Sequence, residues 1–559
     1  MTSSDQNNDY DFVNISAYLQ QMAALQPFKR AVVYPAGRDK GGRVAYSHLT
    51  FQQLDQESDN LAHGLENVGI TRGTRTILMV KPSIEFFALT FALFKTGAVP
   101  VVVDPGMGIR RMIACFQESR PQAFIGIPLA HVLRRLHPKF FKTVSIWITV
   151  GRRWFWGGFT LKQIRRTPWQ AYKTAQTKQD DIAAILFTTG STGPAKGAVY
   201  THGIFDAQIR YIQSHFNITP DEIDLPTFPL FALFDPALGM TAIIPDMDPT
   251  KPGSVNPERI IEAIVNQGVT NMFASPALLN RVGSYGQQKG VVLPTLKRVI
   301  SAGAPVSASN IEQFAKLLSQ DAQIHTPYGA TEAMPVLSIA SPEILSETRM
   351  LSRKGYGICV GRPLPGIDVQ IITISDGPIE TWSQELIVPD GEIGEITVNG
   401  DLVTRQYFEN PRADRLAKIK QENQVWHRMG DLGWKDSKGR IWFCGRKSHR
   451  IITANGTLYT IPCEAIFNNH PRVFRSALVG IGPRSKQKPV ICIELARDKR
   501  RCNKKKIRQE LRELAQQNIL TKDIKTVLFH KSFPVDIRHN SKIFREKLAV
   551  WAEKKLIKK

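Results

Sequence analysis

The sequence lacks the features of membrane-spanning and secreted proteins. Its 559 residues contain no uninterrupted run of 18 or more apolar residues, so we expect no membrane-spanning helix. Residues 1–10 are polar and acidic, whereas a secretory signal has a basic stretch followed by an apolar one, so we expect no such signal. The six cysteines include no Cys-x-x-Cys pair, which argues against structural zinc and is typical of thiols in a reducing compartment. We therefore expect a cytoplasmic protein.

Acidic residues are scarce relative to basic ones, and the net charge of +24 predicts attraction to anionic partners. Within residues 134–166, arginines and lysines are interleaved with phenylalanines and tryptophans. This mixture suits peripheral contact with the anionic inner face of a membrane; the alternative is an ordinary basic surface with core aromatic residues. A second basic run, residues 497–506, has no interleaved aromatic residue, so we interpret it as a solvated face and expect no nucleic-acid partner.

The length of the chain and its 42% hydrophobic content predict at least two domains. Hydrophobic periodicity predicts a helix over residues 51–68 with its N-cap at Thr50, then a buried strand over residues 75–80. A helix over residues 84–94 and a strand over residues 98–103 follow. Strands that alternate with helices at this spacing predict a parallel sheet with crossover connections.

A loop rich in glycine and hydroxyl groups follows an apolar, strand-like run that ends at Phe187. Its glycines let backbone N–H groups approach an anion, its hydroxyls add donors, and Lys196 adds positive charge. The loop differs from a Walker A motif because Ala195 stands in place of a glycine and Gly197 in place of the Ser or Thr that binds Mg²⁺. A flexible surface linker is the alternative. The residues that we expect to bind phosphate are Thr188, Thr189, Gly190, Ser191, Thr192, Gly193 and Lys196.

This loop resembles the motif of the adenylate-forming superfamily, which includes acyl-CoA synthetases, firefly luciferase and the adenylation domains of peptide synthetases. The resemblance extends from about residue 49 to residue 548. It implies an α/β fold with a large N-terminal domain of layered βα sheets, residues 1–445, and a small, mobile α+β C-terminal domain, residues 446–559. The hinge is expected at residues 445–449, where His449 stands in place of the usual Asp or Lys. We assign no pH-switch role to that histidine.

Further segments of the sequence resemble the superfamily motifs that form the nucleotide site. In the segment that begins with Tyr328 and Gly329, the tyrosine would stack on a purine, Thr331 would bond phosphate or ribose, and Glu332 would bind Mg²⁺. Asp431 resembles the aspartate that accepts both ribose hydroxyls, although a turn residue is the alternative. Three further residues resemble parts of the same site: Gly303 and Ala304 in the adenine-binding segment, and Arg446 beside phosphate or ribose.

Two other motifs concern the acid and the chemistry. Phe231, Ala232 and Phe234 resemble the wall of the acyl pocket, where many relatives have a histidine at the position of Ala232; plain core packing is the alternative. Lys542 aligns with the catalytic lysine of the superfamily, although Asn540-Ser541 precede it instead of the usual Ser/Thr-Gly. The alternative for Lys542 is a surface lysine on an amphipathic helix.

These motifs together predict an ATP- and Mg²⁺-dependent enzyme that converts a long-chain acid to an acyl adenylate. The segments after the hinge depart from the usual pattern and resemble the β-lactone synthetases of olefin biosynthesis, which adenylate a long-chain 3-hydroxy acid and let its own hydroxyl displace AMP. We prefer that function, and the resemblance implies that pathway partner enzymes are among the expected partners. The alternatives are a long-chain fatty acid–CoA ligase, which needs CoA, and a non-catalytic, membrane-associated binding protein on the same scaffold.

Overall fold

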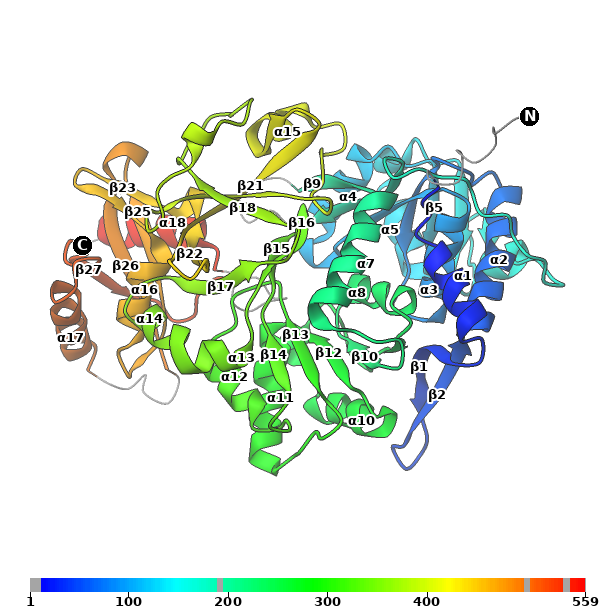
Figure 1. Ribbon diagram of the computed structural model, residues 1–559, viewed down its shortest axis with the longest axis horizontal. Coiled ribbons are helices and arrows are strands. Elements are labelled where there is room, and N and C mark those ends of the chain that lie inside the picture. The colour runs from blue at the N-terminus through cyan, green and yellow to red at the C-terminus, as the bar shows by residue number, and fades with distance from the viewer. Residues whose placement is uncertain (1–11, 189–194, 497–502, 536–542, 558–559) are drawn as a thin grey trace, which may run out of the picture.

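The computed structural model describes residues 12–188, 195–496, 503–535 and 543–557. In these ranges the chain forms two seven-stranded sheets, one eight-stranded sheet, a two-stranded hairpin and a three-stranded sheet. Figure 1 shows the long helix α7 (His202–Phe216) near the centre of the molecule, with the C-terminal elements, in orange and red, at one end. The described residues include no helix that is both long and apolar enough to cross a membrane.

The first seven-stranded sheet has the strand order β7-β6-β5-β3-β4-β8-β9. All neighbouring strands are parallel except β8 and β9, as the alternation of helices and strands in the sequence predicts. Its strands are β3 (Arg75–Met79), β4 (Val99–Val103), β5 (Ala123–Gly126), β6 (Ile146–Thr149), β7 (Phe159–Thr160), β8 (Ile182–Thr188) and β9 (Lys196–Thr201). The helices in this part of the chain are α2 (Phe51–Asn67), α3 (Ile84–Lys95), α4 (Ile109–Glu118), α5 (Pro128–Leu136) and α6 (Leu161–Ile164).

The second seven-stranded sheet has the order β14-β13-β12-β10-β11-β1-β2, and only β1 and β2 are antiparallel. Its strands are β1 (Arg30–Arg38), β2 (Val44–Thr50), β10 (Ile223–Pro226), β11 (Thr241–Ile243), β12 (Asn271–Ala274), β13 (Arg298–Ser301) and β14 (Gln323–His325). The helices associated with it are α1 (Ala17–Leu25), α8 (Pro229–Ala232), α9 (Phe234–Ala237), α10 (Pro257–Gln267), α11 (Pro276–Lys289) and α12 (Ala308–Ala315).

The eight-stranded sheet is antiparallel, with the order β15-β16-β17-β22-β21-β19-β18 and with β20 paired to β21. Its strands are β15 (Tyr328–Ala330), β16 (Ala333–Ser338), β17 (Ile358–Pro363), β18 (Asp368–Ile372), β19 (Gly394–Asn399), β20 (Lys418–Gln421), β21 (Gln424–Lys435) and β22 (Ile441–Arg446). Its short helices are α13 (Ser341–Glu343), α14 (Arg349–Arg353) and α15 (Pro411–Ala417).

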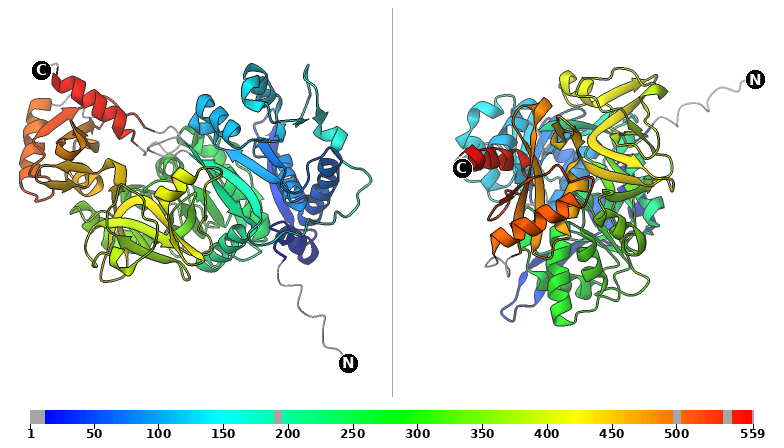
Figure 2. Two further views of the ribbon diagram at one scale, coloured as in Figure 1. Left: turned by 90° about the horizontal axis from the view of Figure 1, so that it is seen from above. Right: turned by 90° about the vertical axis from the view of Figure 1, so that its left-hand side faces the viewer.

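The C-terminal elements form a small α+β unit with its own hydrophobic clusters, as predicted. Figure 2 shows this unit at one end of the molecule. Its strands are β23 (Ile451–Thr453), β24 (Gly456–Leu458), β25 (Val473–Ile481), β26 (Lys488–Leu495) and β27 (Thr526–Phe529), and its helices are α16 (Thr460–Asn468), α17 (Lys504–Gln516) and α18 (Arg545–Ile557). The remaining one-turn segments of the molecule are η1 (Pro105–Met107), η2 (Pro138–Phe141), η3 (Pro252–Ser254), η4 (Ile344–Thr348), η5 (Gln384–Leu386), η6 (Lys447–His449) and η7 (Arg484–Lys486).

Local signals explain the start of α2. The Thr50 side chain accepts a hydrogen bond from the Gln53 N–H and the Gln53 side chain bonds back to Thr50, which completes the predicted N-cap as a capping box. Thr50 is also the last residue of strand β2, which the sequence pattern does not predict. Helix α3 is apolar on nearly every face and is almost entirely buried, so the ammonium of Lys95 is neutralised by Asp55 and Asp59, each at 2.6 Å.

Candidate functional site

A cavity of about 2480 Å³ is lined by residues of all three large sheets and of the C-terminal unit. The two mainly parallel sheets contribute residues at the carboxyl ends of their strands, such as Phe187 of β8 and Ser301 of β13, which is where α/β sheets commonly bind ligands. This cavity is lined by twelve of the predicted site residues, which are all those whose side chains or glycine Cα atoms the structure describes. They are Lys196, Phe231, Ala232, Phe234, Gly303, Ala304, Tyr328, Gly329, Thr331, Glu332, Asp431 and Arg446.

The predicted phosphate loop connects two antiparallel strands, because Thr188 at the end of β8 pairs with Lys196 at the start of β9. The side chain of Thr188 is outside the described part of the structure, as are five further predicted residues of the loop: Thr189, Gly190, Ser191, Thr192 and Gly193. The predicted catalytic Lys542 also lies outside the described residues.

Three predicted nucleotide-site residues contact one another although they come from separate segments. The Tyr328 hydroxyl donates to Asp431 Oδ2 at 2.6 Å, and Arg446 Nη1 lies 3.1 Å from Asp431 Oδ1. Asp431 and Arg446 are cross-strand partners in β21 and β22, so the sheet register brings them together. Burial and then the neighbouring Asp431 raise the pKa of Tyr328 well above its ordinary value, so the phenol remains a donor. Gly329 packs so closely that a Cβ atom there would lie 2.6 Å from the Ala333 carbonyl oxygen.

The Glu332 side chain is held on the wall of the cavity by Tyr407, whose hydroxyl donates to Glu332 Oε1 at 2.6 Å. The backbone carbonyl of Glu332 accepts from the Thr404 N–H at 2.8 Å and from Thr404 Oγ1 at 3.1 Å. No group of three or more His, Cys, Asp or Glu side chains among the described residues is arranged to share a metal ion. A single carboxylate fits Mg²⁺ bound together with substrate phosphates, because Mg²⁺ keeps waters and commonly uses one or two protein carboxylates.

No sequence pattern predicts a site role for Tyr407 or Thr404. Tyr407 and Glu332 are 75 residues apart, and no periodicity or motif spacing relates a phenol to a carboxylate at that distance. The centre of the Tyr407 ring also lies 4.9 Å from the Lys196 ammonium, so Tyr407 contacts both the predicted phosphate loop and the predicted metal ligand.

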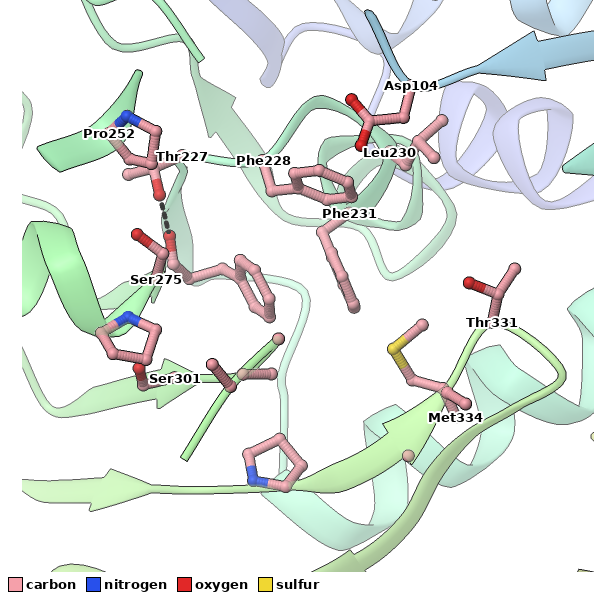
Figure 3. Close-up of a pocket in the computed structure, with 18 of the residues that line it drawn as sticks. Asp104, Thr227, Phe228, Leu230, Phe231, Pro252, Ser275, Ser301, Thr331 and Met334 are labelled. Atoms are coloured by element: carbon pink, nitrogen blue, oxygen red, sulfur yellow. Dashed lines mark hydrogen bonds between the residues drawn. The ribbon is translucent and has the colours of Figure 1, made fainter. Parts of the chain in front are cut away.

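The predicted acyl pocket is an aromatic wall of this cavity. Phe231 stacks on Phe273 with ring centroids 3.9 Å apart, while Ala232 is buried with an exposed fraction of 1%. Figure 3 shows Phe228, Phe231 and Leu230 on one side of the open space and Thr331 and Met334 on the opposite side. The predicted nucleotide residues and the apolar wall therefore face the same space.

The fold agrees with the comparisons with known proteins. Residues 19–408 match the family model described as AMP-binding enzyme. The chain belongs to the AMP-binding enzyme family and is an ATP-dependent enzyme that forms acyl adenylates.

Within that family, the olefin beta-lactone synthetases of Xanthomonas campestris pv. campestris and Stenotrophomonas maltophilia are each 47% identical to the chain. These matches cover 96% and 98% of this chain and 97% and 99% of the two relatives. Acyl-CoA ligases match at only 25 to 27% identity. The structure of the amide bond synthetase McbA from Marinactinospora thermotolerans matches with a TM-score of 0.78 and 21% identity over 96% of this chain and 99% of that one, a likeness of fold alone.

Proposed function

We propose that the protein adenylates a long-chain 3-hydroxy fatty acid with ATP and Mg²⁺, releases pyrophosphate, and then closes the acyl adenylate to a β-lactone with release of AMP. The observation that carries the proposal is the 47% identity to two olefin beta-lactone synthetases over nearly the full length of both chains. The runner-up, a long-chain fatty acid–CoA ligase that would use CoA, has support only from more distant relatives.

The first step brings together two anions, the substrate carboxylate and ATP, so its catalyst must neutralise charge and align the reactants. We assign the phosphates to the loop of residues 188–196 and the ribose to Asp431 and Arg446. Glu332 is the Mg²⁺ ligand, and Mg²⁺ bound there would neutralise charge on the phosphate oxygens. We assign the reacting carboxylate to Lys542, since a compact ammonium can follow the charge as it develops.

In the second step the 3-hydroxyl oxygen attacks the acyl carbon, the bond from that carbon to the phosphate oxygen breaks, and the hydroxyl proton is released as AMP leaves. The nucleophile is part of the substrate, so a high effective molarity favours closure and no CoA is required. The wall formed by Phe231, Ala232 and Phe234 holds the alkyl chain and thereby fixes the carbon that carries the hydroxyl.

We propose that the two domains, residues 1–445 and 446–559, move about a hinge at residues 445–449. Contacts on both sides of this boundary support the assignment. Lys447 Nζ lies 2.8 Å from Glu395 Oε1 in β19, whereas His449 Nε2 lies 3.0 Å from Glu546 Oε1 in α18. The short segment η6 is therefore anchored at one end to the large domain and at the other to the C-terminal helix.

The second part of the proposal is contact with a membrane through residues 134–166. Only some of the aromatic residues in this segment are exposed and available for that contact. Phe141 and Trp156 are buried, but Trp154 and Phe155 are 52% and 76% exposed beside arginines, and Leu136 at the end of α5 is 71% exposed. This exposed apolar and basic surface would attach reversibly to anionic lipid. Liposome co-sedimentation should show salt-sensitive binding to anionic vesicles, whereas equal recovery on neutral vesicles would remove the electrostatic part of the proposal.

The adenylation step is tested by ATP–pyrophosphate exchange that depends on a 3-hydroxy fatty acid and Mg²⁺. Lys542→Ala should lose most of the exchange and still bind ATP, because the lysine acts on the reacting carboxylate. Lys554→Ala is the matched control, since Lys554 is exposed on α18 of the same domain. Exchange at the wild-type rate in Lys542→Ala would mean that this lysine has another role.

A further inference from the structure

Lys418, the first residue of β20, is a buried lysine that the proposed reaction does not use. Its ammonium donates to the Thr404 carbonyl oxygen and, at 3.1 Å, to Thr404 Oγ1. Within the described part of the chain no carboxylate lies within 4 Å of this ammonium. A buried ammonium without a carboxylate partner is costly, so its position calls for a physical explanation.

The contacts of Lys418 lead to Glu332 in two steps. Thr404, which accepts from Lys418, donates both its backbone N–H and its hydroxyl to the carbonyl oxygen of Glu332. The Lys418 ammonium also lies 5.6 Å from the centre of the Tyr407 ring, and the hydroxyl of that ring donates to the Glu332 carboxylate. Tyr407 is fixed in turn, because its backbone N–H donates to Asp414 Oδ1 at 2.7 Å.

The electrostatic environment agrees with this geometry. Burial lowers the pKa of Lys418 to about 7, while the negative charges of Glu332 and Asp414 raise it. Burial also raises the pKa of Tyr407 far above its ordinary value, and Glu332 adds to that effect, so the phenol keeps its proton and remains a donor. The backbone of Glu332 is thus held by Thr404, which Lys418 contacts, and its side chain is held by Tyr407.

We propose that Lys418 and Tyr407 are positioning residues that hold the Glu332 carboxylate in place for the divalent cation of the nucleotide complex. Lys418 acts through Thr404 on the backbone of Glu332, and Tyr407 acts on its side chain. This inference rests on the proposed role of Glu332 as the Mg²⁺ ligand. Partners in the outer shell of a metal ligand commonly change metal affinity by roughly 10- to 100-fold.

The test measures metal binding directly. Mn²⁺ affinity is measured by electron paramagnetic resonance in the presence of a non-hydrolysable ATP analogue, and the Mg²⁺ dependence of pyrophosphate exchange is measured beside it. Tyr407→Phe removes one hydroxyl and keeps the ring, so it should weaken Mn²⁺ binding roughly tenfold and raise the Mg²⁺ concentration needed for half-maximal exchange. Lys418→Gln keeps a donor for Thr404 but no charge, and it should weaken Mn²⁺ binding by a smaller factor.

Tyr285→Phe is the matched control, because Tyr285 donates its hydroxyl to Glu258 on the surface and does not line the cavity. It should leave Mn²⁺ affinity unchanged. Glu332→Gln separates the two proposals. Unchanged Mn²⁺ affinity in Glu332→Gln would remove the metal role of Glu332 from the proposed function. If Glu332→Gln instead loses most of its Mn²⁺ affinity while Tyr407→Phe and Lys418→Gln both keep wild-type affinity, only the positioning role of Tyr407 and Lys418 would be overturned.

Discussion

Replacement of Arg545 by methionine should loosen the C-terminal domain. Arg545 begins α18, three residues after Lys542, and forms a bidentate ion pair with Glu464 of α16 in which Nη2 and Oε2 are 3.0 Å apart. The Glu464 side chain is buried and that of Arg545 is largely covered, with exposed fractions of 6% and 12%. Glu464 Oε1 also accepts the backbone N–H of Leu478 in β25 at 2.7 Å, so the pair links α18, α16 and the sheet.

The size of the effect follows from this burial. Removal of one partner of a buried ion pair typically costs about 3–5 kcal/mol, because the other charge stays buried and unpaired. The Leu478 N–H still satisfies one carboxylate oxygen in Arg545→Met, so we expect the lower end, about 3 kcal/mol, or roughly a hundredfold increase in the open population. Replacement of Glu464 by glutamine in the same chain removes the unpaired charge and should restore part of the loss.

The pH dependence gives a second, independent check. Burial raises the pKa of Glu464, and Arg545 opposes that rise, so loss of Arg545 should raise the pKa further. A carboxyl with a raised pKa in the folded state stabilises the fold at low pH, and this stability is lost as the pH rises through the raised pKa. The defect of Arg545→Met should therefore be larger at pH 8 than at pH 5.

Hydrogen exchange followed by mass spectrometry resolves the opening of single elements. Peptides from α16 and β25 should exchange faster in Arg545→Met, and peptides from β3 and β4 of the large domain provide the internal control. Wild-type protection of β25 in the variant, or a defect of equal size at both pH values, would refute the argument.

Two further predictions concern the acyl pocket and its support. Ala232→Phe should place a ring in the cavity and lower kcat/KM for long-chain acids at least tenfold while leaving kcat/KM for short-chain acids unchanged. A competition assay with acids of mixed chain length measures this preference, and an unchanged preference would mean that Ala232 does not face the substrate. Asp224 and Asp235 are buried and hydrogen bonded to each other, and burial raises the pKa of both, so the free energy of unfolding should fall as the pH rises above about 4. Asp235→Asn should flatten that slope in urea unfolding between pH 5 and pH 8, and an unchanged slope would show that the pair does not titrate with folding.

Elements encoded by local patterns could be predicted from the sequence. The capping box at Thr50, the buried strand β3 and the helix α3 depend on residues within one turn or one strand, and the structure confirms them. Strand β2 was missed because it lies at the end of its sheet and, among the described residues, pairs only with β1. Its side chains show no strict alternation of buried and exposed positions.

Contacts between distant segments could not be predicted in the same way. The segment containing Glu332 was found because it resembles a superfamily motif at the expected distance from the predicted phosphate loop. Its contacts with Thr404 and Tyr407 join residues that are 72 and 75 positions apart in the sequence, which no local pattern relates. The burial of the aromatic residues in 134–166 could not be predicted from the sequence either. The sequence cannot tell which side of an element faces the core, so it grouped the buried Trp156 with the exposed Phe155.

The fate of oxygen labels tests the proposed reaction most directly. A long-chain 3-hydroxy acid labelled with ¹⁸O in both carboxyl oxygens is incubated with ATP and Mg²⁺ in the absence of CoA, and the products are analysed by NMR and mass spectrometry. Attack of the hydroxyl on the acyl adenylate predicts a β-lactone that keeps one label in its carbonyl and AMP that carries the other. Unlabelled AMP together with a doubly labelled lactone would show that ATP activates the hydroxyl and not the carboxylate. If no lactone forms and a thioester appears only when CoA is added, the proposed function is contradicted.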